Sequence, residues 1–307
     1  MKQHHNPVLL KESIDLLVTK TSGKYFEGTL GFGGHTSEIL KRLDKKGAIV
    51  STDVDEQAFR YSKDKFNYDE RVRLYNFNFS LVDVIAKIES IKFFDGIIAD
   101  LGVSSFQLDN PESGFSYSSE APLDLRMDKS IKKNAGDIIN SESEKELEKI
   151  FREYGEERHS RKIAKRIVEK RKLEMITTTS QLKQIISEVI NPRDAVKSFS
   201  RIFQALRILI NDELGKLQEF LKNSVEVLLP GGRLVVISYH SLEDRIVKEF
   251  FRYENLKCVC PKDVPVCTCG KVQRLKIITR KPIVPSEEEI RANRRSRSAK
   301  MRVAERI

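Results

Sequence analysis

No run of more than four consecutive apolar residues occurs in this chain of 307 residues. A membrane-spanning helix needs about 20 such residues and the core of a secretory signal about 7 to 15, so we expect neither, and no membrane partner. Cysteine is also scarce, because all four cysteines lie between positions 258 and 269. A secreted fold held by disulfides is therefore disfavoured, and we expect a cytoplasmic protein.

Two familiar phosphate-binding motifs are missing from a glycine-rich segment at residues 28–34. A dinucleotide-binding turn reads G-x-G-x-x-G, but Thr36 stands where the third glycine belongs when the motif begins at Gly31. A P-loop is excluded because no Gly-Lys-Ser/Thr follows. The segment therefore disfavours NAD, although a dehydrogenase or another nucleotide-cofactor enzyme stays an alternative.

An acid follows this segment at the distance that one intervening helix requires. Asp53 lies 20 residues after Gly33, directly after an apolar stretch at residues 48–50. Glycines let a backbone approach a ligand closely because no Cβ intervenes, and a carboxylate at the next strand end can accept hydrogen bonds from both ribose hydroxyls. A glycine turn and an acid without a pyrophosphate cradle fit S-adenosylmethionine better than NAD; a tight turn with an exposed acid is the alternative.

Strand-like and helix-like patterns alternate along the first hundred residues. Strands are expected at residues 24–28, 48–53, 72–76 and 95–100, with helices at 11–18, 36–43, 56–65 and 81–88 between them. Such alternation predicts an α/β fold with a parallel sheet, whose ligands bind at the carboxyl ends of the strands. Those ends carry Glu27, Asp53 and Asp100.

The middle of the chain breaks this pattern. Residues 110–135 read as a long loop, and residues 141–215 are helical throughout, with starts expected at Ser141, at Thr179 and at residues 198–200. The α/β pattern then resumes with a helix at 214–229, a strand at 233–238, a helix at 241–252 and a strand at 275–279. We therefore expect a split sheet domain, residues 1–109 and 215–307, with an all-helical domain inserted at 110–214.

Positive charge dominates the surface composition. The net charge is +10 and the isoelectric point about 9.3, which favours a polyanionic partner such as nucleic acid. Eight Lys/Arg residues and three acids fall between positions 155 and 172, where they can track an RNA backbone or form an ordinary solvated helix face. The segment 291–307 carries seven Lys/Arg and one Glu, and is expected to be a solvated basic tail.

Several long motifs resemble one family from end to end. They read HNPVLL at 5–10, DLGVSSFQLD at 100–109, GFSY at 114–117, PLDLRMD at 122–128, YGEER at 154–158, FQALRI at 203–208, SYHSLEDR at 238–245 and RSRSA at 295–299, together with the glycine segment and His35. With these motifs the chain resembles the RsmH (MraW) family, bacterial methyltransferases that act on cytidine N4 in small-subunit rRNA.

The resemblance implies a fold, a cofactor and a partner. The fold is a Rossmann-like class I S-adenosylmethionine-dependent methyltransferase sheet with an inserted all-helical domain. The cofactor is S-adenosylmethionine, and the partner is 16S rRNA, methylated in its decoding centre, rather than DNA or a membrane. Naked rRNA and the assembled small ribosomal subunit both stay open as the substrate. The oligomeric state stays open, and a non-catalytic RNA-binding assembly factor that retains a cofactor pocket is the alternative function.

The resemblance also implies cofactor contacts. They are Gly33, Gly34, His35, Asp53, Phe79, Asp100 and Gln107. From the residues alone, Phe79 can flank adenine or be an ordinary core residue, His35 can cap a helix, and Gln107 can be an exposed loop side chain. No metal is required.

Two residues are candidate catalytic groups for methyl transfer to an amine. Asp100 ends the fourth strand, where other amino-methyltransferases carry Asp/Asn-Pro-Pro-Tyr/Phe. Either Asp100 or a backbone carbonyl nearby can accept a hydrogen bond from the exocyclic NH₂. His240 follows the strand at 233–238 and can take the released proton, bind phosphate or cap the next helix. An aromatic partner for the base is then expected from Phe106, Phe115 or Tyr117.

The cysteines form a cluster in the sequence. They are Cys258, Cys260, Cys267 and Cys269, in the pattern C-x-C-x6-C-x-C. Four thiolates in twelve residues can hold zinc, although the usual spacing is C-x2-C. A structural zinc ion and four reduced thiols on a loop therefore both stay open.

Overall fold

The computed structural model describes residues 7–104, 107–108, 114–116, 118, 120–261 and 266–307. The chain divides into a sheet unit, Met1–Gly102 with Leu214–Ile307, and a helical unit, Val103–Glu213. Val103, Ser104, Gln107 and Leu108, which we expected in the sheet domain, thus belong to the helical unit. The reason is packing, since Val103 and Leu108 lie against the apolar core of the helices.

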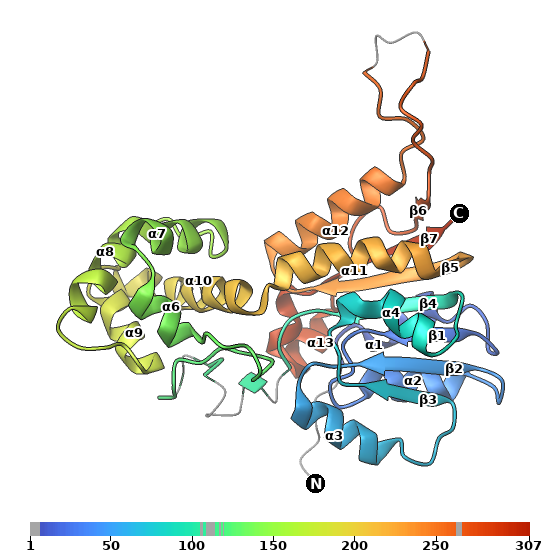
Figure 1. The fold of residues 1–307 in the computed structure, drawn as a ribbon, viewed down its shortest axis with the longest axis horizontal. Helices are drawn as coiled ribbons and strands as arrows, with labels where there is room; N and C mark the ends of the chain where they lie inside the picture. Colours follow the sequence, from blue (N-terminus) through green and yellow to red (C-terminus); the bar gives the residue numbers. More distant parts are fainter. Residues whose placement is uncertain (1–6, 105–106, 109–113, 117, 119, 262–265) are drawn as a thin grey trace. The chain divides into compact units, whose positions relative to one another are not determined.

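The sheet unit is built on a seven-stranded sheet with the strand order β3-β2-β1-β4-β5-β7-β6 (Figure 1). The strands are β1 (Lys24–Glu27), β2 (Ala48–Thr52), β3 (Val72–Tyr75), β4 (Phe94–Asp100), β5 (Leu228–Ser238), β6 (Leu275–Ile277) and β7 (Lys300–Arg306). β1 to β5 pair in parallel, and β7 runs antiparallel between β5 and β6. The predicted Rossmann-like class I fold is confirmed.

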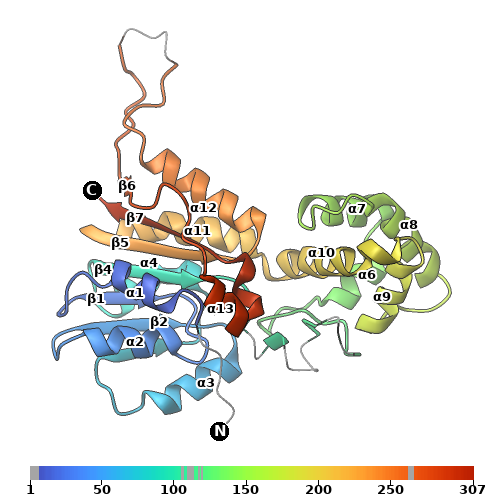
Figure 2. The ribbon, with the colours of Figure 1, turned by 180° about the vertical axis from the view of Figure 1, so that it is seen from behind.

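Helices cover both faces of this sheet (Figure 2). They are α1 (Leu10–Leu17), α2 (Gly34–Arg42), α3 (Glu56–Lys65), η1 (Phe79–Leu81), α4 (Val82–Ile88), α11 (Glu213–Val227), α12 (Ser241–Glu254), α13 (Glu287–Ala292) and η3 (Arg294–Ser298). Successive strand residues point to opposite faces. Tyr25 accordingly packs in a core with α1 and α2, whereas its neighbour Phe26 packs in another with α4, α11 and α12.

The expected solvated basic tail is wrong, because residues 300–306 form the sheet strand β7 and most of the residues before them lie in α13 and η3. Met301 and Val303 enter one apolar core and Ala304 the other. Arg302 is only 8% exposed, and its Nε donates to Oδ1 of Asp244 at 2.6 Å. The basic residues between the apolar positions obscured the pattern of a strand in the sequence. Inside the protein, Asp244 neutralises the charge of Arg302.

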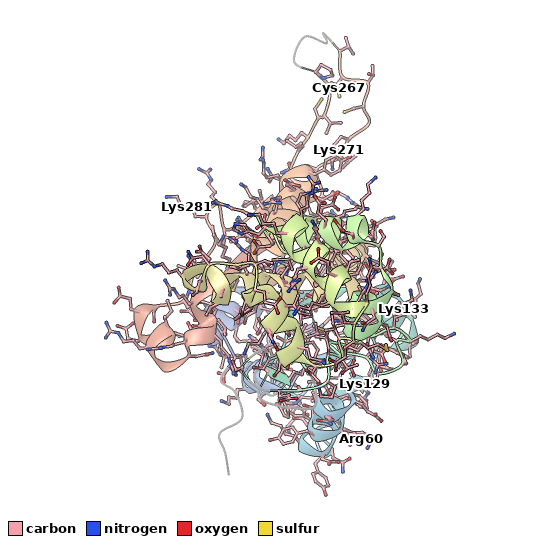
Figure 3. The ribbon with its side chains drawn as sticks, turned by 90° about the vertical axis from the view of Figure 1, so that its left-hand side faces the viewer. Arg60, Lys129, Lys133, Cys267, Lys271 and Lys281 are labelled. Atoms are coloured by element: carbon pink, nitrogen blue, oxygen red, sulfur yellow. The ribbon has the colours of Figure 1, made fainter. Side chains whose placement is uncertain are left out.

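A long connection between α12 and β6 carries the cysteines. In Figure 3 it extends beyond α12, with Lys271 nearer the helix and Cys267 farther out. At its base, Arg274 Nε and Lys271 Nζ both donate to Oε2 of Glu254, at 2.6 and 3.3 Å, and Glu254 is buried at the end of α12. Both ends of the connection are therefore anchored on the same helix.

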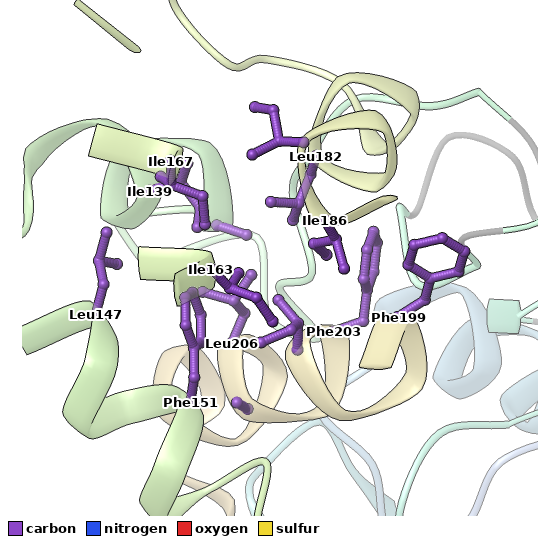
Figure 4. Packing of buried hydrophobic residues seen from close by; sticks show 14 of the residues in the cluster. Ile139, Leu147, Phe151, Ile163, Ile167, Leu182, Ile186, Phe199, Phe203 and Leu206 are labelled. Carbon is purple, nitrogen blue, oxygen red and sulfur yellow. The ribbon is translucent and has the colours of Figure 1, made fainter. Parts of the chain in front are cut away.

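The helical unit has its own apolar core. Its helices are α6 (Ala135–Ser141), α7 (Glu144–Glu153), α8 (Ser160–Arg171), α9 (Thr179–Ser187) and α10 (Pro192–Asn211). Figure 4 shows Phe151, Ile163 and Leu206 of three different helices meeting in this core. None of the helices in the described residues combines the length and apolar character that a membrane span requires.

The helix starts in this unit follow capping chemistry, which corrects one expectation. Thr178 and Gln181 form a capping box for α9, one residue before the expected start. α10 begins at Pro192, with Asn191 as its cap, and not at residues 198–200. Ser198 lies within α10 and is buried. It therefore packs on the apolar face of the helix and does not cap a helix start.

Candidate functional site

The glycine segment forms the turn between β1 and α2. Gly31 and Gly33 have φ angles of 50° and 69°, which L-residues with a side chain rarely adopt. A Cβ on Gly33 would lie 2.4 Å from the Phe66 ring, and one on Gly34 would lie 2.1 Å from Pro7, whereas a Cβ on Gly31 would meet nothing within 4 Å. Packing thus explains Gly33 and Gly34, and Gly31 borders open space.

Asp53, directly after β2, holds this turn in place. Its Oδ2 accepts a hydrogen bond from Gly31 N at 2.7 Å, and its Oδ1 accepts one from Asp55 N at 2.9 Å. Burial raises the pKa of Asp53 to about 6, although both hydrogen bonds act in the opposite direction. Each carboxylate oxygen has a second lone pair, so Asp53 can accept further bonds from a ligand.

Glu27 is a buried acid of this site that the sequence analysis did not select as a site residue. Its carboxyl is 1% exposed and accepts a hydrogen bond from Thr36 Oγ1 of α2. Burial, with a smaller contribution from the charges of Asp100 and Asp53, raises its pKa to about 8. A charged residue ending an apolar strand was the available signal. Because the charges of Asp100 and Asp53 act on Glu27, the ends of β1, β2 and β4 bring three carboxyl groups near one another.

Asp100 ends β4 and faces a tyrosine. Tyr239 Oη donates to Asp100 Oδ1 at 2.8 Å, while Asp100 N donates to Thr29 Oγ1 at 2.7 Å. Burial raises the pKa of Asp100 to about 7; the Tyr239 hydrogen bond lowers it, and the charges of Glu243 and Glu289 raise it. Sequence reasoning missed Tyr239, which follows β5 just as Asp100 ends β4.

His240 is the N-cap of α12. Its Nδ1 accepts a hydrogen bond from Glu243 N at 3.4 Å, and its Nε2 lies 3.2 Å from Glu243 Oε1. The same glutamate accepts hydrogen bonds from the Tyr239 and His240 backbones through Oε2, at 2.8 and 3.3 Å. Of the alternatives that the sequence left open, helix capping is therefore the role that the contacts describe, and a catalytic role stays a prediction.

Phe79 and His35 lie beside the turn. Phe79 begins η1 after β3 and is half-buried. Its ring packs edge-on against that of Phe220, with the ring centroids 5.0 Å apart. A Cβ on Gly28 would lie only 2.7 Å from Phe79, so this aromatic residue adjoins the start of the glycine segment. His35 is buried in the first turn of α2, with Nδ1 at 3.9 Å from Glu27 Oε1.

The remaining predicted residues belong to the helical unit. Gln107 Oε1 accepts a hydrogen bond from Ser104 N at 2.9 Å. Phe115 is 7% exposed and packs in the helical core, which makes it a poor candidate for stacking on a base. The other two aromatic candidates, Phe106 and Tyr117, lie outside the described residues, as do His5 and Asn6.

The chemistry of the sheet unit's site fits S-adenosylmethionine. Three acids with raised pKa values converge where Gly31 leaves open space, so a bound cation would relieve their mutual repulsion. Lys65 is the nearby cation, but its Nζ donates to the carbonyls of Phe32 and Gly33 at 3.0 and 3.2 Å. S-adenosylmethionine carries a sulfonium cation and ribose hydroxyls, the two kinds of group that such a set of acids can accommodate.

The fold and this site define a class I methyltransferase, and S-adenosylmethionine is its methyl donor. The model of the MraW methylase family matches residues 2–307. Two relatives named ribosomal RNA small subunit methyltransferase H are 52% identical over 304 residues (Caldicellulosiruptor saccharolyticus; 99% of each chain) and 48% identical over 310 residues (Carboxydothermus hydrogenoformans; 100% and 99%). The chain belongs to the MraW methylase family.

Proposed function

We propose that this protein transfers a methyl group from S-adenosylmethionine to the exocyclic N4 amine of a cytidine in the decoding centre of 16S rRNA. The Asp100–Tyr239 pair, at the edge of the sheet where three carboxyl groups converge, carries the proposal. The names of the relatives support small-subunit rRNA as the substrate. A substrate in the ribosomal subunit also implies a cytoplasmic site of action.

The residues divide the work between binding and orientation. S-adenosylmethionine supplies a methyl group on a sulfonium, which is already an activated leaving group. Asp53 would accept hydrogen bonds from the ribose hydroxyls, and Gly31, whose Cβ position is open, would leave the backbone room for the donor. Gly33 and Gly34 keep the turn in shape, and the Phe79 ring would flank the adenine.

Asp100 orients the amine. The cytosine N4 lone pair is delocalised into the ring, so a hydrogen-bond acceptor on N4–H makes the nitrogen more nucleophilic and holds it in line. Tyr239 occupies Oδ1, and among the described residues Oδ2 has no hydrogen-bond donor, which leaves Oδ2 for the amine. His240 stays the second candidate for the released proton.

The helical unit supplies the RNA-binding surface. Arg158, Arg161, Lys162 and Lys172 are exposed and make no ion pair within the described part of the chain. Arg166 and Lys170, by contrast, pair with Glu188. Ile163 and Ile167 are fully buried, so α8 faces its own core with one side and presents basic residues with the other. Only the unpaired cations are available for phosphates.

The double variant Arg161→Glu/Lys162→Glu is therefore expected to weaken binding of small-subunit RNA about 10- to 100-fold at physiological salt. The affinity for S-adenosylmethionine should not change. Filter binding for RNA and calorimetry for the donor measure the two affinities. The charge-matched control Lys222→Glu/Lys248→Glu changes exposed residues of α11 and α12 and should bind RNA nearly as well as the wild type. Equal losses in both doubles would mean that only net charge matters.

The function itself is tested with small ribosomal subunits that lack the modification and a donor carrying a radiolabelled methyl group. After the reaction, the 16S rRNA is digested to nucleosides and the labelled product is identified. N4-methylcytidine at a decoding-centre position is the expected product. Label in another nucleoside, or in ribosomal protein, would refute the proposal.

A further inference from the structure

The four cysteine thiols converge at one point of the connection between α12 and β6. All four Sγ atoms lie within 4.8 Å of one another. Cys267 Sγ lies 3.4 Å from that of Cys258, 3.6 Å from that of Cys269 and 3.9 Å from that of Cys260. The Cys258 and Cys269 sulfurs are 3.8 Å apart. Two C-x-C pairs that are separated along the chain thus form one compact group of sulfurs.

These distances match a metal-centred tetrahedron. With metal–sulfur bonds of about 2.3 Å, as for zinc, the edges of a tetrahedral tetrathiolate are about 3.8 Å long. The four measured separations, 3.4 to 3.9 Å, bracket that edge. A disulfide needs sulfurs about 2.05 Å apart, so no pair here is a disulfide. Each sulfur lies within 4.8 Å of the other three, which pairwise bonding does not explain.

The backbone around the sulfurs suits thiolates. Cys260 N donates to Cys258 Sγ at 3.3 Å, and Val259 N donates to Cys269 Sγ at 3.4 Å. Such N–H···S bonds stabilise negative charge on metal-bound sulfur. Lys257 directly precedes Cys258, and Lys271 follows two residues after Cys269. Lys257 adds positive charge beside a site whose four thiolates and one divalent ion carry a net charge of −2, whereas Lys271 is already paired with Glu254.

The surroundings give the site a structural task. Glu254 anchors the base of the connection through Lys271 and Arg274. Farther out, Val259 and Val266 are 44% and 68% exposed, so they contribute little apolar burial to hold that part together. A cross-link from a metal is the remaining means of ordering it, as in other small segments with too little core.

We propose that Cys258, Cys260, Cys267 and Cys269 bind one Zn²⁺ ion that orders this connection. Four thiolates in a tetrahedral arrangement select zinc or iron among the common metals. Zinc has no redox chemistry and fully occupies its four positions here, so the site is structural and separate from methyl transfer. Binding displaces the thiol protons, up to four per ion, into solvent.

The test uses full-length protein purified without chelator. Elemental analysis is expected to find one zinc per chain. Because the chain has only these four cysteines, a colorimetric thiol reagent reports this site alone: nearly no thiol should react before a strong chelator is added, and four should react afterwards. Replacement of zinc by Co²⁺ should give the intense visible bands and sulfur charge-transfer absorption of a tetrahedral thiolate site.

Matched variants show whether the cysteines bind the metal. Cys258→Ser/Cys267→Ser should lose the zinc and the cobalt spectrum, whereas Val259→Ser, in the same segment, should keep both. Circular dichroism shows whether the sheet stays folded in each variant. Metal-free wild-type protein with four freely reactive thiols after incubation with zinc would overturn the proposal. So would iron in place of zinc, or zinc retained by the double variant.

Discussion

Asp53→Asn is expected to raise the dissociation constant for S-adenosylmethionine about 100-fold. The carboxylate makes two charge-assisted hydrogen bonds to the ribose hydroxyls in our proposal, and each such bond contributes about 1.5–3 kcal/mol. A neutral amide of the same size has one acceptor oxygen fewer and loses the charge. The loss of about 2.7 kcal/mol corresponds to the 100-fold change. Titration calorimetry measures it.

Asp55→Asn is the matched control for this variant. It removes one negative charge two residues from Asp53. Asp55 caps α3 by accepting hydrogen bonds from Gln57 N and Ala58 N, and asparagine caps helices equally well. Its affinity for S-adenosylmethionine should stay within about threefold of the wild type. If Asp53→Asn bound the donor as tightly as Asp55→Asn, the ribose would lie elsewhere.

Asp100→Asn is expected to lower kcat about 100-fold or more, whereas its donor affinity should fall by no more than about tenfold, the effect of the lost charge near the sulfonium. The oxygen of the amide can still accept the hydrogen bond from Tyr239 Oη. This orientation places the amide NH₂ at the former position of Oδ2. That group repels the N4 amine, and the loss of one preorganised hydrogen-bonding partner in a site of this kind costs about 10²–10³ in rate. Single-turnover methyl transfer measures it. Full turnover with weaker donor binding would assign Asp100 to the cofactor alone.

The pH profile separates this role from a structural one. The acceptor must be ionised, and the pKa of Asp100 is about 7, so kcat/KM of the wild type should rise with pH through about 7. Asp100→Asn should lose that rise. Tyr239→Phe removes a hydrogen bond that lowers the pKa of Asp100. Its rate should therefore recover at high pH, with the rise displaced upward, and a profile unchanged from the wild type would contradict the pairing.

The sequence was most informative where local chemistry decides the structure. The first four strands and the helices between them follow from periodicity, and Asp53 and Asp100 lie at strand ends as expected. The same periodicity failed for β7, because a strand between two neighbours can carry Arg302 once Asp244 neutralises it. That pairing joins residues 58 positions apart and has no local signal.

The candidate site shows the same contrast between features with a local sequence signal and features that arise from long-range pairing. The glycine turn and the acids could be found from their spacing, but the partner of Asp100 could not. Tyr239 lies 139 residues farther along the chain and meets Asp100 only because β5 pairs with β4. Glu27 looked like the polar end of a strand, and only its complete burial shows that it shares charge repulsion with the other two acids.

In our proposal, the carboxyl groups at the ends of β1, β2 and β4 surround the sulfonium of the donor. Calorimetric titration of S-adenosylmethionine and of S-adenosylhomocysteine between pH 6 and pH 8 tests it most directly, because the two ligands share every charged group except the sulfonium. The pKa values of Asp53, Asp100 and Glu27 are about 6, 7 and 8, and a nearby cation favours their ionised forms. Affinity for S-adenosylmethionine should therefore rise about tenfold over this range relative to that for S-adenosylhomocysteine, the equivalent of a shift of about one pKa unit. Parallel pH dependences for the two ligands would contradict the account.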